Sequence, residues 1–263
     1  MKTKTIVLIH GMFMSPLCWE NWIPYYESKG YKVIAPAWPG RDKPNEELRK
    51  AHPDPELAKL KLGDIVAHME NIIKGLDEKP AIIGHSMGGL VVQLLLQRDV
   101  AVAGVSINPA PPAGVFTTEW SFLKSNLPAI NPFLLNRPAM MTFEHFQYAM
   151  ANTLPLDEQR AAYDRYMVPE SRGVPTSSLG AAGKVDFHRP RRPLLITAGE
   201  KDHIVPASLN RSNYQKYQGT FVTDFKEFVG RDHLLISSQG WEEIADYALD
   251  WLNQKVEWCF RVS

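Results

Sequence analysis

The pentapeptide Gly84-His85-Ser86-Met87-Gly88 places a serine hydroxyl between two glycines, where an apolar run ends and a helical pattern begins. In a sharp strand-to-helix turn, a serine hydroxyl stands above the sheet with the positive end of the helix behind it. Flanking small residues let neighbouring chain pass close by. The pattern predicts Ser86 as the nucleophile of an acyl-transfer reaction. The alternative is that Ser86 only caps the helix.

A serine hydroxyl is a weak nucleophile, so it needs a general base and a group that orients the base. In an open α/β sheet, reactive side chains gather beyond the carboxyl ends of the strands. Two later apolar segments end in a carboxylate beside a histidine, Asp202-His203 and Asp232-His233. These four residues are the candidate acids and bases. Glu200 is a further candidate for the acid, and Asp232 is expected to cap or to face water.

The other histidines show no paired spacing of the kind that holds a metal, so the sequence predicts neither a metal nor a cofactor. They are expected to be structural or surface residues, except for two that flank the site, His10 and His85.

Strands and helices alternate along much of the chain. Short apolar, β-branched runs are typical of buried parallel strands, and apolar residues with a period of 3.6 predict helices. We expect strands at 5–9, 31–35, 81–83, 102–107, 193–198 and 220–228, helices at 16–29, 55–76, 87–98, 207–217 and 241–256, and a loop at 41–55.

This alternation predicts a doubly wound, mostly parallel α/β sheet with helices on both faces. The alternation stops in residues 109–190, which are rich in proline and aromatic residues. We therefore predict an α/β core made of residues 1–108 and 191–263, with residues 109–190 inserted as a helical cap.

Composition limits the partners. The 263 residues contain 29 Lys plus Arg and 29 Asp plus Glu, with 44% hydrophobic residues. A neutral chain has no general electrostatic attraction to nucleic acid or anionic membranes, and no stretch approaches the length of a membrane span. The sequence does not indicate an oligomeric state.

Two cysteines, Cys18 and Cys259, favour a reducing compartment, although one disulfide stays open. The apolar run Ile6–Ile9 after the basic start is too short for a signal peptide, so a cytoplasmic location is expected.

With these residues in view, the chain resembles the α/β-hydrolases. The resemblance spans almost the whole chain, in the order nucleophile, acid, base. It rests on His10-Gly11, the pentapeptide around Ser86, GEKDHIVP at 199–206 and GRDHLLI at 230–236.

The resemblance implies a triad of Ser86, Asp202 and His233. It also implies an oxyanion hole formed by the backbone N–H groups of Met12 and Met87, with Phe13 as a possible substitute for Met12.

One departure from the family is informative. Typical members carry a strand hairpin before the His-Gly strand, whereas here that strand begins by residue 5. The shorter start resembles the branch of small esterases and hydroxynitrile lyases, and implies a sheet of about six strands rather than eight.

Most large apolar residues of the inserted segment are expected to pack the cap onto the core, and a few to line an apolar pocket over Ser86. Arg41 and Asp42 are expected to border its opening. The candidate pocket residues are Phe13, His85, Trp120, Phe143, Phe146, Glu170 and His203.

These features favour a serine hydrolase that cleaves a carboxylic ester, lactone or thioester of a small or medium apolar substrate. Two alternatives stay open, because function resides in the pocket rather than in the fold. The same residues could perform hydroxynitrile cleavage, carbon–carbon bond hydrolysis or perhydrolysis, or the fold could serve as a ligand receptor.

Overall fold

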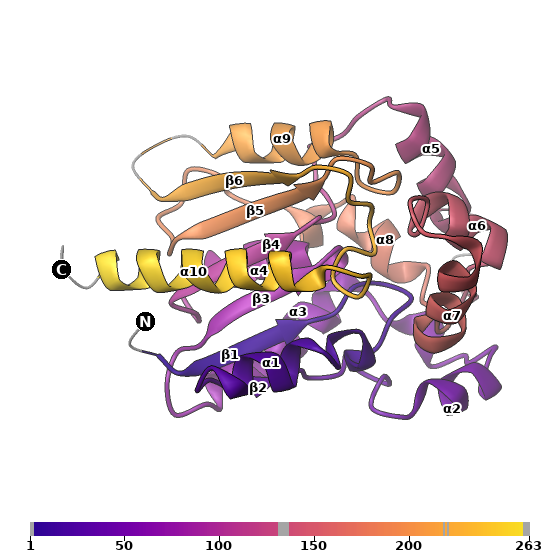
Figure 1. The fold of residues 1–263 in the computed structure, drawn as a ribbon, viewed down its shortest axis with the longest axis horizontal. Coiled ribbons are helices and arrows are strands. Elements are labelled where there is room, and N and C mark those ends of the chain that lie inside the picture. The colour runs from indigo at the N-terminus through magenta and orange to yellow at the C-terminus, as the bar shows by residue number, and fades with distance from the viewer. Residues whose placement is uncertain (1–2, 131–136, 218, 220, 260–263) are drawn as a thin grey trace.

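The structure is a computed structural model that describes residues 3–130, 137–217, 219 and 221–259. Its centre is one six-stranded sheet in the order β2-β1-β3-β4-β5-β6, with every neighbouring pair parallel (Figure 1). The expected parallel sheet of about six strands is therefore confirmed. The strands are β1 Thr5–Ile9, β2 Lys32–Ile34, β3 Ala81–His85, β4 Ala103–Ile107, β5 Leu194–Gly199 and β6 Thr223–Phe228.

Helices cover both faces of the sheet (Figure 1). On one face lie α1 (Trp22–Ser28) and α10 (Trp241–Cys259). On the other lie α3 (Leu62–Lys74), α4 (Met87–Leu96) and α9 (Ala207–Lys216). Alternate strand residues enter separate apolar clusters on the two faces, as expected of strands buried on both sides.

The segment between β4 and β5 contributes no strand to the sheet among its described residues. It contains α5 (Trp120–Asn126), α6 (Phe143–Ala149), α7 (Leu156–Tyr166), α8 (Gly173–Ser178) and two 3-10 turns, η3 (Leu127–Ile130) and η5 (Ala181–Gly183). Helices α5 to α8 lie beyond the carboxyl ends of the strands, on the right in Figure 1. Reactive groups at the strand ends therefore face these helices.

Three local expectations were wrong. The loop expected at 41–55 contains a helix, α2 (Asn45–Lys50), which has Glu46 and Glu47 in its first turn and basic residues in its last. These charges complement the helix dipole, an effect that the flanking prolines obscured in the sequence.

The two long helices expected at 16–29 and 55–76 are each divided into a 3-10 turn and an α-helix: η1 (Pro16–Trp19) before α1, and η2 (Leu57–Lys59) before α3. The second break is stabilised by Asp64, whose carboxylate accepts a 3.0 Å hydrogen bond from the Lys61 N–H. This interaction caps α3 at its true start.

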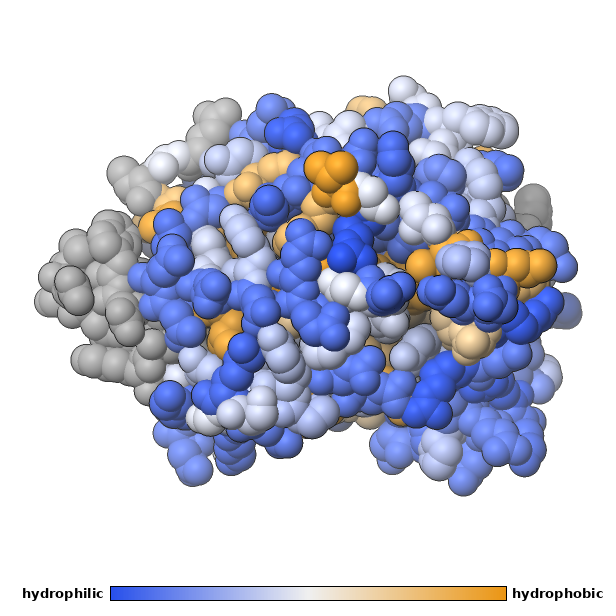
Figure 2. All heavy atoms as spheres, viewed as in Figure 1, coloured by the Kyte–Doolittle hydropathy of each residue, from blue (hydrophilic) through white to orange (hydrophobic). Residues whose placement is uncertain are grey.

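The visible surface is a mixture of charged and polar residues with scattered apolar ones (Figure 2). No helix within the described ranges is long and apolar enough to cross a membrane. Cys18 is buried with a free thiol, and burial raises the pKa of that thiol. The side chain of Cys259 lies outside the described part of the chain.

The contact between α4 and β1 leaves no room for a side chain at Gly88. A Cβ atom there would lie 2.2 Å from the Ile9 carbonyl oxygen and 2.5 Å from that of His10. Both atoms belong to the backbone of β1 and the loop after it, so moving either of them would cost considerable free energy. Adjacent parallel pairing of β1 and β3, with Ile9 opposite Gly84, fixes this geometry.

We expect Gly88→Ala to lower the free energy of unfolding by about 3 kcal/mol or more, because the added methyl group overlaps backbone. Gly63→Ala is the matched control: it lies in α3, where nothing is within 4 Å of an added Cβ. That change should raise stability by about 0.5–1 kcal/mol through helix propensity. Urea denaturation of both variants tests the expectation, and equal stabilities would contradict it.

Candidate active site

Ser86 occupies a strained turn between β3 and α4. Its backbone has φ 57° and ψ −121°, and its side chain makes no capping hydrogen bond to the helix. The interpretation of Ser86 as an ordinary helix cap is therefore wrong. A positive φ at a residue other than glycine costs about 1–3 kcal/mol and persists only where its surroundings enforce it. The hydroxyl stays available for another partner.

Hydrogen bonds from the next strand hold this backbone in place. The Ser86 N–H donates to the Ile107 carbonyl at 2.9 Å, and the Ser86 carbonyl accepts from the Ala110 N–H at 2.9 Å. On the opposite side, a Cβ atom at Gly11 would lie 2.8 Å from the Ser86 Cβ. The loop after β1 thus packs directly against the serine.

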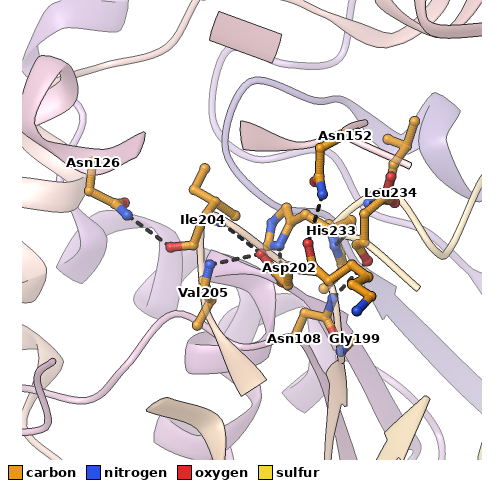
Figure 3. A network of polar contacts seen from close by, with 12 residues as sticks. Asn108, Asn126, Asn152, Gly199, Asp202, Ile204, Val205, His233 and Leu234 are labelled. Carbon is orange, nitrogen blue, oxygen red and sulfur yellow. Dashed lines mark hydrogen bonds and ion pairs between the residues drawn. The ribbon is translucent and has the colours of Figure 1, made fainter. Parts of the chain in front are cut away.

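Asp202 and His233 meet at the ends of β5 and β6 (Figure 3). The His233 Nδ1 lies 2.6 Å from Asp202 Oδ2, and both side chains are buried. The other oxygen of Asp202 accepts the N–H groups of Ile204 at 2.9 Å and Val205 at 2.8 Å. The carboxylate is therefore fully engaged as an acceptor, which makes Nδ1 the protonated nitrogen of His233.

This tautomer leaves Nε2 of His233 as an acceptor. Nε2 is buried and has no hydrogen-bond partner in the described part of the chain. His233 and Ser86 line the same cavity. An imidazole nitrogen without a partner, in the cavity that also holds a serine hydroxyl, is the arrangement a general base requires.

The rival acids and bases have other roles. Asp232 is buried and accepts hydrogen bonds from Thr153 N–H at 3.1 Å, Thr153 Oγ1 at 2.7 Å and Leu234 N–H at 3.0 Å. It caps backbone as expected, but it does not face water, and burial raises the pKa of its carboxyl group. Glu200 is exposed, accepts from the Gly230 N–H at 2.8 Å and forms an ion pair with Lys201 at 3.2 Å.

His85 holds the backbone of His233 through a hydrogen bond. Its Nε2 lies 2.8 Å from the His233 carbonyl oxygen, so Nε2–H is the donor, and the two rings are 4.6 Å apart. Burial holds the pKa of His85 well below its usual range, and the nearby His233 adds to the effect. A neutral ring at position 85 thus anchors the backbone of the candidate base.

The cavity has a volume of about 280 Å³. Met12, Phe13, Ser86, Met87 and His233 all line it, as the sequence analysis expected of site residues. Large apolar residues of the inserted segment, of which a few were expected to line the pocket, do so, including Phe122, Met140 and Met141. His145, expected to be structural or at the surface, also lines the cavity, as do Ser125, Arg172 and Leu179, which no sequence signal indicated.

Six of the seven candidate pocket residues lie outside this lining, so only Phe13 of that set belongs to it. Trp120 is 72% exposed, and Phe146 is buried in the core. Phe143 packs beside Tyr163 with ring centroids 5.4 Å apart. The remaining three, His85, Glu170 and His203, bond to backbone instead: the first to His233, the second to Phe13 and Ser171, and the third to Tyr148.

Met12 and Met87, the residues expected to form the oxyanion hole, both line the cavity. Met87 is the first residue of α4, and the first amides of a helix have no partner within it. Phe13 differs. Its backbone has φ 59°, and its N–H donates to Glu170 Oε2 at 3.2 Å. The idea that the Phe13 amide substitutes for Met12 is therefore wrong, because that amide is already engaged.

Glu170 and Arg41 form a buried ion pair behind this loop. Arg41 Nη2 lies 2.7 Å from Glu170 Oε2, and both side chains are almost fully inaccessible to solvent. The second oxygen of Glu170 accepts the Ser171 N–H at 2.7 Å. Arg41 was expected to border the opening of the pocket. It lies instead against a separate groove. Its guanidinium holds the Glu170 carboxylate, and that carboxylate in turn accepts the Phe13 N–H of the loop after β1.

His10 is buried on the other side of the loop. Its Nδ1 is 2.9 Å from the Gly11 carbonyl oxygen, and its Nε2 accepts the Trp38 N–H at 3.3 Å. Burial lowers the pKa of His10 to about 3, with a smaller contribution from Arg41. One nitrogen must donate and the other accept, so only the neutral ring fits. No cluster of three or more His, Cys, Asp or Glu able to hold a metal occurs in the described ranges.

Comparison with known proteins agrees with this architecture. A family model described as the alpha/beta hydrolase family matches residues 6–247. A pyrethroid hydrolase of Sphingobium wenxiniae is 30% identical over 98 residues, covering 37% of this chain and 32% of that protein. The match thus spans about a third of the length of that relative.

Solved structures cover nearly the whole chain. A pyrethroid hydrolase from Sphingobium faniae JZ-2 aligns with a TM-score of 0.71 and 19% identity, over 97% of this chain and 100% of that one. Polyneuridine aldehyde esterase aligns with a TM-score of 0.68 and 18% identity, over 95% and 99%. At these identities the likeness is one of fold.

We expect Glu170→Gln to lower the free energy of unfolding by about 3–5 kcal/mol, because it leaves Arg41 buried without its counter-charge. Glu158→Gln, on the exposed face of α7, is the matched control and should change stability by less than about 0.5 kcal/mol. Replacing the pair together, with Arg41→Met and Glu170→Leu, should recover part of the loss. Similar denaturation midpoints for the Glu170 and Glu158 variants would contradict the buried ion pair.

A second expectation concerns acid. The folded-state pKa of His10 is about 3, below its unfolded value of 6.5. Between these values the unfolded chain binds the additional proton, so stability falls as pH falls. The slope reaches about 1.4 kcal/mol per pH unit for one group. His10→Gln should flatten the pH dependence of unfolding between about pH 6 and 4. Parallel curves for parent and variant would show that position 10 does not govern acid stability.

Proposed function

The chain belongs to the alpha/beta hydrolase family, and from that premise we propose that it is a cofactor-free serine hydrolase of carboxylic esters. The observation that carries the proposal is the 2.6 Å contact between His233 Nδ1 and Asp202, with the far nitrogen of His233 unpartnered beside the Ser86 cavity. The matched relatives include proteins named as a hydrolase and as an esterase, which supports the reaction class.

In the proposed mechanism, Ser86 Oγ attacks the ester carbonyl while His233 Nε2 takes the hydroxyl proton. Asp202 keeps the imidazole in the required tautomer and stabilises its charged form. The amides of Met12 and Met87 stabilise the negative oxygen, each worth about 2.7–4 kcal/mol in the transition state. His233 then gives its proton to the leaving alcohol. Water, deprotonated by the same nitrogen, attacks the acyl-enzyme and releases the acid and Ser86.

We further propose that residues 109–190 act as a cap that defines the substrate. Most residues that line the cavity come from this segment, among them Phe122, Met140, Met141 and Leu179. Their side chains are apolar, so desolvation favours an apolar acyl or alcohol group. A volume of about 280 Å³ suits a small or medium substrate.

The first test is intact mass after treatment with a small fluorophosphonate. The parent should gain one adduct, and Ser86→Ala should gain none while it keeps its circular dichroism spectrum and melting temperature. Ser178→Ala is the matched control, because Ser178 lines the same cavity; its adduct should persist. An adduct on folded Ser86→Ala protein would overturn the assignment of the nucleophile.

The role of Asp202 makes a separate prediction. Asp202→Asn keeps the side-chain shape but favours the wrong imidazole tautomer, so kcat on a short-chain ester should fall by roughly 10⁴-fold. KM should change little. An unchanged kcat would remove Asp202 from the mechanism and return attention to the other carboxylates at the strand ends.

A further inference from the structure

The cavity beside Ser86 contains an uncompensated positive charge. Arg172 lines this cavity, and no Asp, Glu or Lys is among the described residues that line it. The walls are otherwise largely apolar, and the positive end of α4 also faces the cavity at Met87. The electrostatic character of the cavity is therefore positive.

Arg172 has no carboxylate partner in the described part of the chain. Its one hydrogen bond runs from Nη1 to the Pro128 carbonyl, and its Nε is buried without a partner there. Residues 131–136, the part of the inserted segment that the structure does not describe, contain no Asp or Glu. The nearest acidic residue in sequence, Glu170, is already paired with Arg41.

The backbone that carries Arg172 is fixed on both sides. Ser171 Oγ donates to the Leu60 carbonyl at 2.7 Å and accepts the Gly173 N–H at 3.0 Å. A Cβ atom at Gly173 would lie 2.7 Å from the same Leu60 oxygen. The backbone at Arg172 is thus held in place, which is how a residue that recognises a ligand is positioned, although the side chain itself is half-buried.

A second unsatisfied group lines the same cavity. Ser125 is 2% exposed, lines the cavity, and its Oγ has no hydrogen-bond partner in the described ranges. A buried polar group without a partner is costly, and a bound ligand that supplies the missing partner removes the cost. A guanidinium with free donors and a free hydroxyl together suit a carboxylate.

We propose that the substrate is an ester that also carries a carboxylate, which Arg172 binds while Ser86 attacks the ester carbonyl. This inference rests on the proposed function and names its substrate class. The charge can belong to the acyl part or to the alcohol part, and the two sources need separate probes.

The test compares charged and neutral esters of similar length. Monomethyl adipate is paired with methyl heptanoate for charge on the acyl side, and acetoxyhexanoate with heptyl acetate for charge on the alcohol side. We expect kcat/KM to favour the charged ester in at least one pair by roughly tenfold or more, as charge-assisted hydrogen bonds imply. Raising the salt concentration should reduce the preference.

The variant Arg172→Met should abolish this preference, because kcat/KM for the charged ester should fall by roughly tenfold more than kcat/KM for its neutral partner. Arg172→Lys should keep part of the preference, since it retains charge but loses the planar fork. Arg137→Met is the matched control: Arg137 is exposed, lies in the same inserted segment and does not line the cavity. It removes the same charge and should keep the parent's preference.

The outcomes separate the two proposals. Turnover of neutral esters with no preference for either charged ester, or a preference that survives Arg172→Met, overturns the substrate class and leaves the esterase standing. If Arg137→Met loses the preference for charged esters as fully as Arg172→Met does, the preference arises from the overall charge of the protein, which also overturns the role of Arg172. No turnover of any ester together with no fluorophosphonate adduct on Ser86 overturns the proposed function itself.

Discussion

The site depends on one constraint, the positive φ of Ser86. This conformation is unfavourable in isolation, and the neighbouring backbone enforces it. The Ser86 N–H and C=O are bonded to Ile107 and Ala110 on one side, and Gly11 leaves no space on the other. Because β1 and β4 flank β3, the strand order supplies both contacts. The sheet order therefore dictates where the serine hydroxyl points.

Burial also requires the imidazole rings of His10 and His85, two residues beside the site, to be neutral. Burial disfavours the charged ring at His10 and His85, and each holds a backbone carbonyl beside the site. Their carbonyl partners belong to Gly11, which packs against Ser86, and to His233, which lines the cavity with Ser86. Among the described residues that line the cavity, Arg172 is therefore the permanently charged side chain, while the Asp202 carboxylate contacts His233 and does not line the cavity.

The sequence alone was sufficient to predict the features that follow from a repeating pattern of apolar residues. Apolar runs and helical periodicity predicted the strands and their parallel direction. The strand ends left several candidate acids and bases, and the resemblance to the α/β-hydrolases selected Asp202 and His233, which lie 2.6 Å apart. Pocket residues were predicted poorly. The sequence around an aromatic residue such as Phe146 is the same whether the residue faces a cavity or the core. Which way it faces depends on how α6 is rotated about its axis relative to the rest of the fold, and tertiary packing decides that rotation.

The spacing of residues along the sequence also does not predict ion pairs between distant segments, such as the pair of Arg41 with Glu170. This pair matters because it shapes the loop after β1. The Glu170 carboxylate accepts the Phe13 N–H, so this amide is already engaged in the loop from which Met12 and Phe13 line the cavity. Glu170 belongs to the inserted segment, so this segment helps to shape the loop after β1 as well as to cover it. Arg172 follows two residues later on the same fixed backbone. A shift of this backbone would therefore change the loop beside Ser86 and the charge in the cavity together, which couples substrate recognition to the geometry of catalysis in the proposed mechanism.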